Sequence, residues 1–380
     1  MNLPEKLHKK LQSRFDNNSL RTLSPQTTLI DFASNDYLGF SRSLEISEQS
    51  NSLLKQNGFS ANGSTGSRLL SGNHDLYNQA ETLIKDYHSG EAALIFNSGY
   101  DANLGFFSSV PQRDDIVLYD ELSHASIRDG IKLGNAKAYK FDHNDFEDLE
   151  KQILKHKASS TNIYIVTESV FSMDGDSPDL TSLVELSEKY ECYLIVDEAH
   201  ALGVFGEYGS GMVQNLQLQN RVFARIMTFG KGLGCHGAAI IGSEQLRNYL
   251  INFARSFIYT TALPPHAIAT IICSYNFLKT NPHLQQQLQD NISHFSQEKS
   301  RLGLKPIFVR SKSAVQCAII PGNDRVRTFA NALQKQGFDV KGILSPTVPE
   351  GQERLRFCIH SFNKKEQITA VLKSLEKLLF

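Results

Sequence analysis

Short apolar segments rich in β-branched residues alternate with helical patterns over residues 80–245, and this alternation restricts the fold more than any other feature. A clear helical pattern, residues 179–190 after Pro178, separates two such segments. Strands that alternate with helices form mostly parallel sheets, which helices cover on both faces. We therefore predict an α/β fold built on a mostly parallel seven-stranded sheet. The predicted strands are residues 92–96, 115–119, 136–141, 162–168, 193–198, 225–229 and 237–242.

The segments on either side of this block predict further elements. Residues 1–22 are predicted to form one helix. Residues 266–302, after the break ALPPH, are predicted to form one long amphipathic helix. Strand and helix patterns then alternate up to a last helix that starts near residue 364. A chain of 380 residues is long enough for more than one core. We expect an N-terminal helix and arm (1–38), a large domain (39–262) and a smaller C-terminal α+β domain (263–380).

Charge and composition exclude several classes of function. The 39 basic and 40 acidic residues leave a net charge of −1, which argues against a general nucleic-acid-binding protein. No apolar run approaches the roughly 20 residues of a transmembrane helix, and the N-terminus lacks the apolar stretch of a secretory signal. The five cysteines are scattered and lack Cys-x-x-Cys spacing, so we expect no metal site, no disulfide framework and a reducing cytoplasmic location.

Lys231 lies in TFGKGLG, directly after a predicted strand and between two glycines. Ligands of parallel sheets bind beyond the carboxyl ends of the strands, so residues at these positions are the first candidates for a functional site. A lysine that forms an imine must be partly desolvated, and flanking glycines allow a bulky ligand to approach the backbone. Most single lysines are solvated surface charges, so the interpretation depends on these flanking residues.

Asp197 ends the predicted strand YLIVD, and His200 follows in the same loop. A carboxylate paired with a protonated pyridine nitrogen keeps pyridoxal 5′-phosphate (PLP) a strong electron sink. An aspartate that caps the following turn is the structural alternative. Lys231 and Asp197 are therefore candidates for the imine-forming lysine and the pyridine partner of a PLP site, and the turn cap remains open for Asp197.

Further candidates also follow predicted strands. Ser98, Gly99 and Tyr100 stand between a strand and a helical run, the arrangement that binds phosphate on free backbone N–H groups. His124 lies where an imidazole could stack on a planar cofactor, although a lone histidine is more often structural, and Ser172 also follows a strand end.

Two arginines are candidates for binding a substrate. Arg354 and Arg356 alternate with apolar residues in ERLRFCIH, so on a strand they share one face. Either guanidinium could bind a substrate carboxylate through paired hydrogen bonds, and a solvated face is the alternative.

Three motifs indicate other functions but lack the required context. Residues 197–200 read DEAH, as in helicase ATPases, but the phosphate-binding G-x-x-x-x-G-K-[ST] is missing, because the only Gly-Lys pair lies downstream and is followed by Gly232. Residues 232–237 match G-x-G-x-x-G but lead into a strand instead of a helix. Residues 174–176 read DGD without the distal ligands of a calcium loop. A non-catalytic nucleotide-binding switch is the alternative from a different class of function.

Taken together, the motifs closely resemble one family, the α-oxoamine synthases, which are PLP-dependent transferases of fold type I. The resemblance extends over nearly the whole chain in the family's order. It implies a large PLP-binding domain and a smaller C-terminal domain. The matching segments are FASNDYLGF (32–40), GSTGSRLLSGNHDLY (63–77), LSHASIRDG (122–130), TESVFSMDGDSPDL (167–180), VDEAHALGVFGEYGSG (196–211), TFGKGLGCHGAAI (228–240), FIYTTALPP (257–265) and TVPEGQERLRF (347–357).

Within the family, the run TFGKG followed by GAA is similar to the branch that makes 8-amino-7-oxononanoate for biotin synthesis. This resemblance implies a PLP-dependent acyltransferase that condenses L-alanine with a pimeloyl thioester and releases CO2 and the free thiol. Glycine C-acetyltransferase activity is the alternative within the family. The sequence leaves open pimeloyl-CoA, pimeloyl carrier protein or a shorter acyl-CoA as donor, and alanine, glycine or serine as amino acid. Between Leu23 and Asp31 the chain is shorter than typical members, which predicts a differently built substrate channel.

The resemblance also implies a role for each matching residue. Lys231 would hold PLP as an imine and then act as the base that removes the Cα proton, and Asp197 would pair with the pyridine nitrogen. His200 would contact the phenolic oxygen of PLP, and His124 would stack on its ring. The remaining implied cofactor contacts are Ser172 beside the O3′ atom, Glu168 in support of the site, and Ser98, Gly99, Tyr100 and Thr228 around the phosphate.

Substrate and partner contacts follow from the same resemblance. Asn35 and Arg356 would hold the amino-acid carboxylate, and Arg21 would contribute to the substrate site. Thr260 and Thr261 would reach the phosphate bound in a partner subunit, so a homodimer with a shared active site is implied.

Overall fold

The computed structural model describes residues 3–23 and 28–380, and the described chain forms two compact units. The large unit contains Asn35–Ser172 and Ser177–Gln286. The small unit contains the described residues up to Ser34 together with Met173–Asp176 and Gln287–Phe380. Each unit combines segments that are distant in the sequence, and the small unit joins the N-terminal arm to the C-terminal region.

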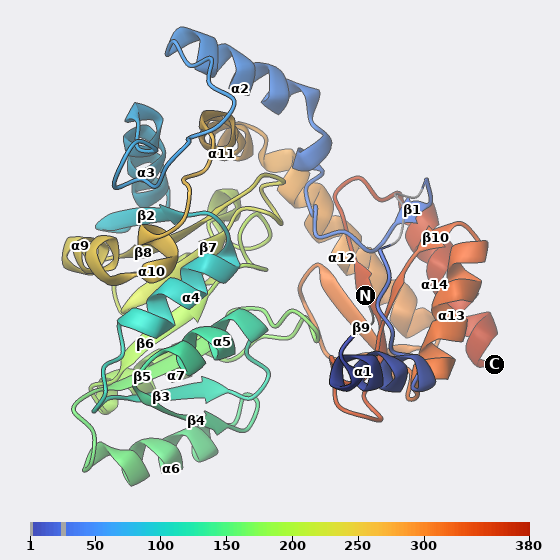
Figure 1. The fold of residues 1–380 in the computed structure, drawn as a ribbon. Coiled ribbons are helices and arrows are strands. Elements are labelled where there is room, and N and C mark those ends of the chain that lie inside the picture. Colours follow the sequence, from blue (N-terminus) through green and yellow to red (C-terminus); the bar gives the residue numbers. More distant parts are fainter. Residues whose placement is uncertain (1–2, 24–27) are drawn as a thin grey trace. The chain divides into compact units, whose positions relative to one another are not determined.

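A seven-stranded sheet forms the centre of the large unit, with strand order β2-β8-β7-β6-β5-β3-β4 (Figure 1). The neighbours from β7 to β4 pair in parallel, and β8 is antiparallel to both β2 and β7. The mostly parallel sheet expected for fold type I is therefore confirmed, and every predicted strand overlaps an observed one. The strands are β2 (Ala92–Phe96), β3 (Ile116–Asp120), β4 (Lys137–Phe141), β5 (Ile163–Glu168), β6 (Tyr193–Asp197), β7 (Ala224–Thr228) and β8 (Ala238–Gly242).

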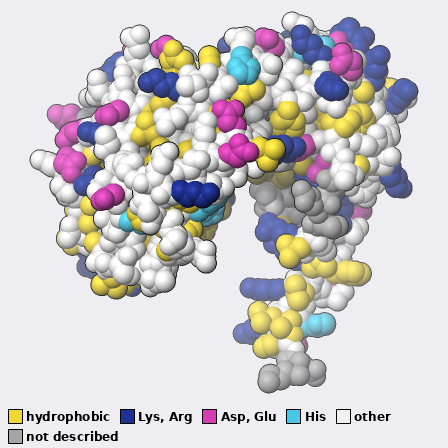
Figure 2. Space-filling view, turned by 90° about the horizontal axis from the view of Figure 1, so that it is seen from above, with side chains coloured by type: hydrophobic (Ala, Val, Ile, Leu, Met, Phe, Trp, Pro, Cys, Tyr) yellow, Lys and Arg dark blue, Asp and Glu magenta, His cyan; other side chains and the backbone are white. Residues whose placement is uncertain are grey.

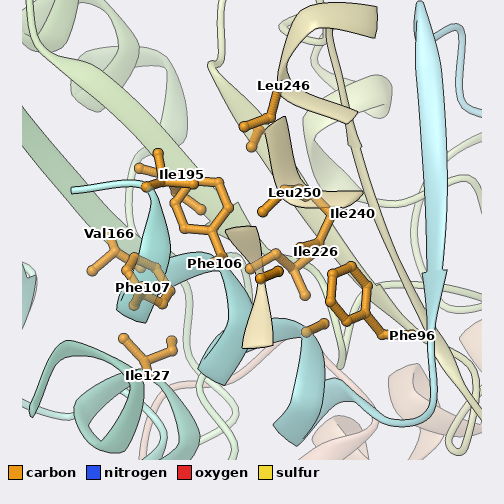
Figure 3. Packing of buried hydrophobic residues seen from close by; sticks show 14 of the residues in the cluster. Phe96, Phe106, Phe107, Ile127, Val166, Ile195, Ile226, Ile240, Leu246 and Leu250 are labelled. Atoms are coloured by element: carbon orange, nitrogen blue, oxygen red, sulfur yellow. The ribbon is translucent and has the colours of Figure 1, made fainter. Parts of the chain in front are cut away.

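Helices cover both faces of this sheet because successive strand residues point to opposite faces. Val166 and Ile195 face one core cluster, and their neighbours Ile165 and Val196 face the other. Figure 3 shows the first cluster, in which the rings of Phe106 and neighbouring residues of α4 lie against the strands. The helices on this face are α4 (Gly99–Ser109), α5 (Ala125–Leu133), α9 (Glu244–Phe253) and α10 (Arg255–Ile258), and those on the other are α6 (Phe146–Lys157), α7 (Leu180–Lys189) and α8 (Met212–Asn215).

A third group of helices completes the large unit. Helix α11 (Pro265–Thr280) packs against α2 (Leu44–Gln56) and against α3 (Asp75–Tyr87). Helix α11 is apolar on much of its surface, since residues such as Ile268, Ile271 and Leu278 are buried. This packing explains why α11 belongs to the large unit, although it follows residue 262.

The small unit contains a three-stranded antiparallel sheet in the order β11-β12-β9. A short parallel pair joins β1 (Ile30–Asp31) to β10 (Phe338–Asp339), and the N–H of Cys358 donates to the carbonyl of Phe32. These backbone bonds fix the N-terminal arm to the C-terminal region. The other elements are β9 (Val315–Ile319), β11 (Lys341–Ile343), β12 (Arg354–Cys358), α1 (Glu5–Asp16), α13 (Asn323–Lys335) and α14 (Lys365–Leu379).

Two helix predictions were wrong in their extent. The helix predicted over residues 1–22 ends at Asp16, because Asn18 adopts a positive φ of 49° that stops the helix. The single helix predicted over residues 266–302 is two helices, α11 and α12 (Pro282–Arg301). Pro282 has no N–H to donate to the preceding turn, and its ring excludes helical backbone at Asn281. The shortened stretch between Leu23 and Asp31 includes residues 24–27, which lie outside the described residues.

The surface carries charges of both signs. On the face seen in Figure 2, Lys and Arg side chains lie scattered among Asp and Glu side chains. Among the helices within residues 3–23 and 28–380, none has the length and apolar character needed to cross a bilayer.

We expect Phe106→Ala to destabilise the large unit strongly. Phe106 has no exposed surface and lies in the core between α4 and the sheet (Figure 3). Removing its ring loses buried apolar area and leaves a cavity, which costs about 3–5 kcal/mol of unfolding free energy. Urea unfolding measures the loss. Phe380→Ala is the matched control, since that ring is 92% exposed, and equal effects of the two substitutions would contradict the assignment of the core.

Candidate active site

Three buried carboxyl groups end three adjacent parallel strands of the large unit. Asp120 ends β3, Glu168 ends β5 and Asp197 ends β6, and their exposed fractions are 0%, 3% and 5%. Glu168 and Asp197 are direct partners in the strand register. Parallel strands end at the same edge of the sheet, so the carboxyl groups gather there. Such an edge is where open α/β sheets bind their ligands.

The carboxylate of Asp197 accepts hydrogen bonds from two elements. Its Oδ1 accepts the N–H of Ala199 at 2.9 Å, which closes the turn after β6. Its Oδ2 accepts the side-chain amide of Asn103, at 2.9 Å, from the middle of α4. The turn-capping role considered as an alternative is therefore present, and Asn103 adds a second, tertiary contact.

Glu168 lies beside Asp197 and is expected to be largely neutral. Burial and the negative charge of Asp197 raise the pKa of Glu168 to about 8. Its Oε1 accepts the backbone N–H of His124 at 2.6 Å. That bond fixes the start of α5, where His124 is the N-terminal cap.

The ring of His124 lies within electrostatic reach of both Asp197 and Lys231. Burial lowers the pKa of His124, the charge of Asp197 opposes this shift, and the charge of Lys231 adds to it. The positive charge of Lys231 also acts on Glu168, where it offsets part of the rise in pKa. The four side chains therefore form one cluster, although they come from four separate segments of the chain.

Lys231 itself is half-buried in the loop between β7 and β8. This loop lies close against the loop that follows Asp197, since a Cβ atom on Gly232 would collide with the carbonyl oxygen of Leu202. Glycine at position 232 thus permits two backbone segments to touch. The flanking glycine therefore serves backbone packing, in addition to the ligand approach considered from the sequence.

The strand–turn–helix predicted for residues 96–100 is confirmed. Ser98 caps α4: its Oγ accepts the N–H of Asp101 at 3.1 Å. The N–H groups of the first turn have no partners within the helix. A Cβ on Gly99 would collide with the hydroxyl of Thr228, so the end of β7 lies directly against the helix start. The ring of Tyr100 is 46% exposed, and its hydroxyl donates to Asp129 at 2.6 Å.

Thr260 and Thr261 lie beside the same turn. The side-chain amide of Asn97 donates to the hydroxyl of Thr260 at 3.1 Å and to the carbonyl of Thr261 at 2.7 Å. Asn97 directly precedes the cap residue Ser98, so the threonine loop lies next to the start of α4 within one chain.

His200 is buried and contacts Tyr37, whose hydroxyl lies 2.6 Å from Nδ1 of the histidine. The same hydroxyl lies 3.3 Å from Oδ1 of Asn35. Tyr37 has no exposed surface and connects two of the predicted site residues. Ser172 is buried in the loop that follows β5.

The two arginines of β12 have different surroundings inside the small unit. Arg354 pairs with Asp174 and donates to the carbonyls of Met173 and Gln352. Arg356 lies with its Nη1 atom 3.1 Å from the sulfur of Cys358. Both guanidinium groups are buried, which excludes the solvated face considered above.

Arg21 lies in the segment after α1, and it also belongs to the small unit. It is exposed, and its Nη2 donates to the hydroxyl of Thr347 at 3.2 Å.

Sequence reasoning missed several side chains that complete the cluster. Asn103 lies inside a helical run, where an asparagine gives no signal of a tertiary contact. Ser126 lies within LSHASIRDG, where nothing local distinguishes it from the serine of an ordinary helix start. Tyr37 lies within FASNDYLGF, and the sequence gives no signal of its contact with His200. Asp120 could have been found, since it directly follows a predicted strand, as Asp197 ends one.

Comparisons with known proteins identify the family of this chain. Residues 27–375 match the family described as "Aminotransferase class I and II". An 8-amino-7-oxononanoate synthase of Emericella nidulans is 38% identical over 98% of this chain and 95% of its own length.

Two solved structures are also similar. A serine palmitoyltransferase of S. paucimobilis, solved with a bound PLP–myriocin aldimine, is 25% identical with a TM-score of 0.89, covering 98% of this chain and 96% of the other. An 8-amino-7-oxononanoate synthase from Francisella tularensis is 28% identical with a TM-score of 0.78, covering 93% and 98%.

The raised pKa of Glu168 predicts a pH-dependent stability. The folded protein should retain a proton that the unfolded chain releases, between the ordinary value of 4.5 and about 8. The unfolding free energy of the protein without added ligand should therefore fall as the pH rises through this window, by up to ~1.4 kcal/mol per pH unit for one proton.

Urea unfolding across this window measures the effect. Glu168→Gln mimics the neutral carboxyl group, so the variant should lose this part of the decline. Glu147→Gln is the control because Glu147 is exposed, and it should retain the wild-type slope. The same slope in Glu168→Gln as in the wild type would show that Glu168 is ionised throughout.

Proposed function

Since this chain belongs to the class I and II aminotransferase family and is a PLP-dependent acyltransferase of the α-oxoamine synthase type, we propose that it condenses L-alanine with a pimeloyl thioester. The products are 8-amino-7-oxononanoate, CO2 and the free thiol, and the reaction belongs to biotin biosynthesis. The relative named 8-amino-7-oxononanoate synthase, matched over 98% of this chain, supports the choice of substrates. The cluster of Lys231, His124, Glu168 and Asp197 is the observation that carries the chemistry.

The described residues include the groups that PLP requires: an amine at Lys231, a carboxylate at Asp197 and a helix start at Gly99. The start of α4 at Gly99 offers first-turn N–H groups of the kind that bind phosphate, and the close approach of Gly99 places the hydroxyl of Thr228 at the same turn. Ser98 and Tyr100 belong to the same turn, and Thr260 and Thr261 lie next to it. PLP, when bound, supplies an electron sink that stabilises negative charge at the Cα atom of an amino acid.

The side chains of the cluster would divide the work of catalysis. Asp197 would hold a proton on the pyridine nitrogen through its carboxylate, and His200 would orient the phenolic oxygen. His124 would lie on the face of the ring, with Ser172 beside O3′ and Glu168 fixing the backbone of His124. The Nζ atom of Lys231 would remove the proton from Cα of alanine as a general base.

Arg356 and Asn35 would bind the carboxylate of the amino acid, and Arg21 would line the substrate site. Arg354 is the weaker candidate because its guanidinium is engaged by Asp174 and two carbonyl oxygens. A planar guanidinium can bind a carboxylate through two parallel hydrogen bonds.

The proposal includes a homodimer in the cytoplasm. Thr260 and Thr261 would reach the phosphate site of the partner subunit. The division of the chain into an N-terminal arm (1–38), a large domain (39–262) and a C-terminal domain (263–380) is likewise kept as a proposal about domains.

Substrate specificity is tested by crossing L-alanine, glycine and L-serine with pimeloyl, acetyl and palmitoyl thioesters. We expect the highest kcat/KM for alanine with a pimeloyl thioester, with CoA and carrier-protein forms compared separately. Lys231→Ala should abolish turnover and the visible absorbance of bound cofactor, whereas Lys279→Ala, at an exposed position, should retain both. A clear preference for glycine with acetyl-CoA, or for serine with palmitoyl-CoA, would overturn the proposed substrates.

We expect Arg356→Ala to raise the KM for alanine while the cofactor absorbance stays unchanged. Losing a desolvated charged contact costs about 2–5 kcal/mol. Steady-state kinetics over alanine concentration measure the change, and Arg310→Ala is the control because Arg310 is exposed in the same unit. An unchanged KM in Arg356→Ala would transfer the role to Arg354.

A further inference from the structure

We propose that Asn103 and Ser126 are positioning residues that fix the ring of His124 as the neutral tautomer with its proton on Nε2. They do so through hydrogen bonds that start at the amide of Asn103, which donates to Asp197 on one side and to Ser126, next to His124, on the other. The inference deepens the proposed site, and it does not depend on which thioester is the substrate.

The hydrogen bonds start at the amide of Asn103, which is 2% exposed in α4. Its Nδ2 lies 2.9 Å from Oδ2 of Asp197 and 3.0 Å from Oγ of Ser126. An ionised carboxylate only accepts hydrogen bonds, so the amide must turn its NH2 group toward Asp197. Both N–H bonds are then used, one for Asp197 and one for Ser126.

The cost of this orientation is visible in the structure. Within the described part of the chain, Oδ1 of Asn103 is buried and has no hydrogen-bond partner. A buried acceptor without a partner is unfavourable, so the surroundings of the NH2 group impose the orientation. The amide direction is therefore determined by its two acceptors.

The orientation of the Asn103 amide determines which atom the hydroxyl of Ser126 donates its proton to. Because Oγ accepts from Asn103, its single proton is available to another acceptor, and Nδ1 of His124 lies 2.7 Å away. The backbone N–H of Ser126 also points at Nδ1, at 3.2 Å. A proton on Nδ1 would face this N–H directly, so Nδ1 must be the acceptor and the ring proton must be on Nε2.

The electrostatic surroundings favour a neutral ring. Burial is the largest influence on His124, and it lowers the pKa of the imidazole. The positive charges of Lys231 and Arg128 act in the same direction, while Asp197 and Asp129 oppose it.

The fixed tautomer has a chemical consequence for the site. A neutral ring places no positive charge against the protonated pyridine ring on which His124 is proposed to stack. Its Nε2–H can only donate, so the imidazole cannot compete with Lys231 as a base. Asn103 thereby connects the charge of Asp197 to the protonation state of His124.

The test uses holoenzyme labelled with 15N in its histidines. Two-bond proton–nitrogen correlation spectra separate the two neutral tautomers and the imidazolium, and His124→Gln identifies the His124 signals among the 12 histidines. At neutral pH the wild type should show a protonated Nε2 and an unprotonated Nδ1. Ser126→Ala removes the hydroxyl donor and should raise the proportion of the Nδ1–H tautomer by up to about tenfold.

Asn103→Leu, which removes the amide at similar volume, should shift the same signals. Ser123→Ala is the matched control: Ser123 directly precedes His124, its side chain is 1% exposed, and within the described residues its hydroxyl has no partner, so the His124 signals should not move. An imidazolium or Nδ1–H ring in the wild type, or unchanged signals in both Ser126→Ala and Asn103→Leu, would overturn the proposal. The predicted tautomer in a protein that turns over none of the thioesters would support it and reject only the proposed substrates.

Discussion

Burial of negative charge at the carboxyl edge of the large sheet is the constraint on which the site depends. Asp120, Glu168 and Asp197 end neighbouring strands, and none of them is more than slightly exposed. A buried carboxylate is costly unless hydrogen bonds or charges compensate it. Asp120 is compensated by His143 at 2.8 Å, Asp197 by Asn103, and Glu168 by a pKa raised toward the neutral form.

This constraint couples the elements that surround the edge. The middle of α4 supplies Asn103, and the cap of α5 supplies His124, whose N–H is held by Glu168. Strand β8 runs antiparallel to β7, so the loop between them, which carries Lys231, lies at the edge where β7 ends. Side chains from four segments thus meet because the strands share one direction and one end.

In the small unit, the corresponding constraint is buried positive charge. Its arginines on β12 are buried, and the strand lies between β9 and β11, so their guanidinium groups must find partners inside the fold. Arg354 meets Asp174, which reaches this unit from a segment far away in the sequence. The pairing of β1 with β10 has the same character, since it joins the N-terminal arm to residues more than three hundred positions later.

The sequence by itself determined the strands, their mostly parallel arrangement and the residues at their ends, because apolar period and strand–helix alternation are local properties. Lys231, Asp197 and the turn at Gly99 were visible for this reason. Pro282 also marks the break between α11 and α12 in the sequence. The amphipathic pattern continues across this proline, however, and therefore predicts a single helix. Only the tertiary structure decided which side chains meet: Asn103 lies 94 residues from Asp197, and hydrogen-bond partners this distant leave no periodic trace in the chain.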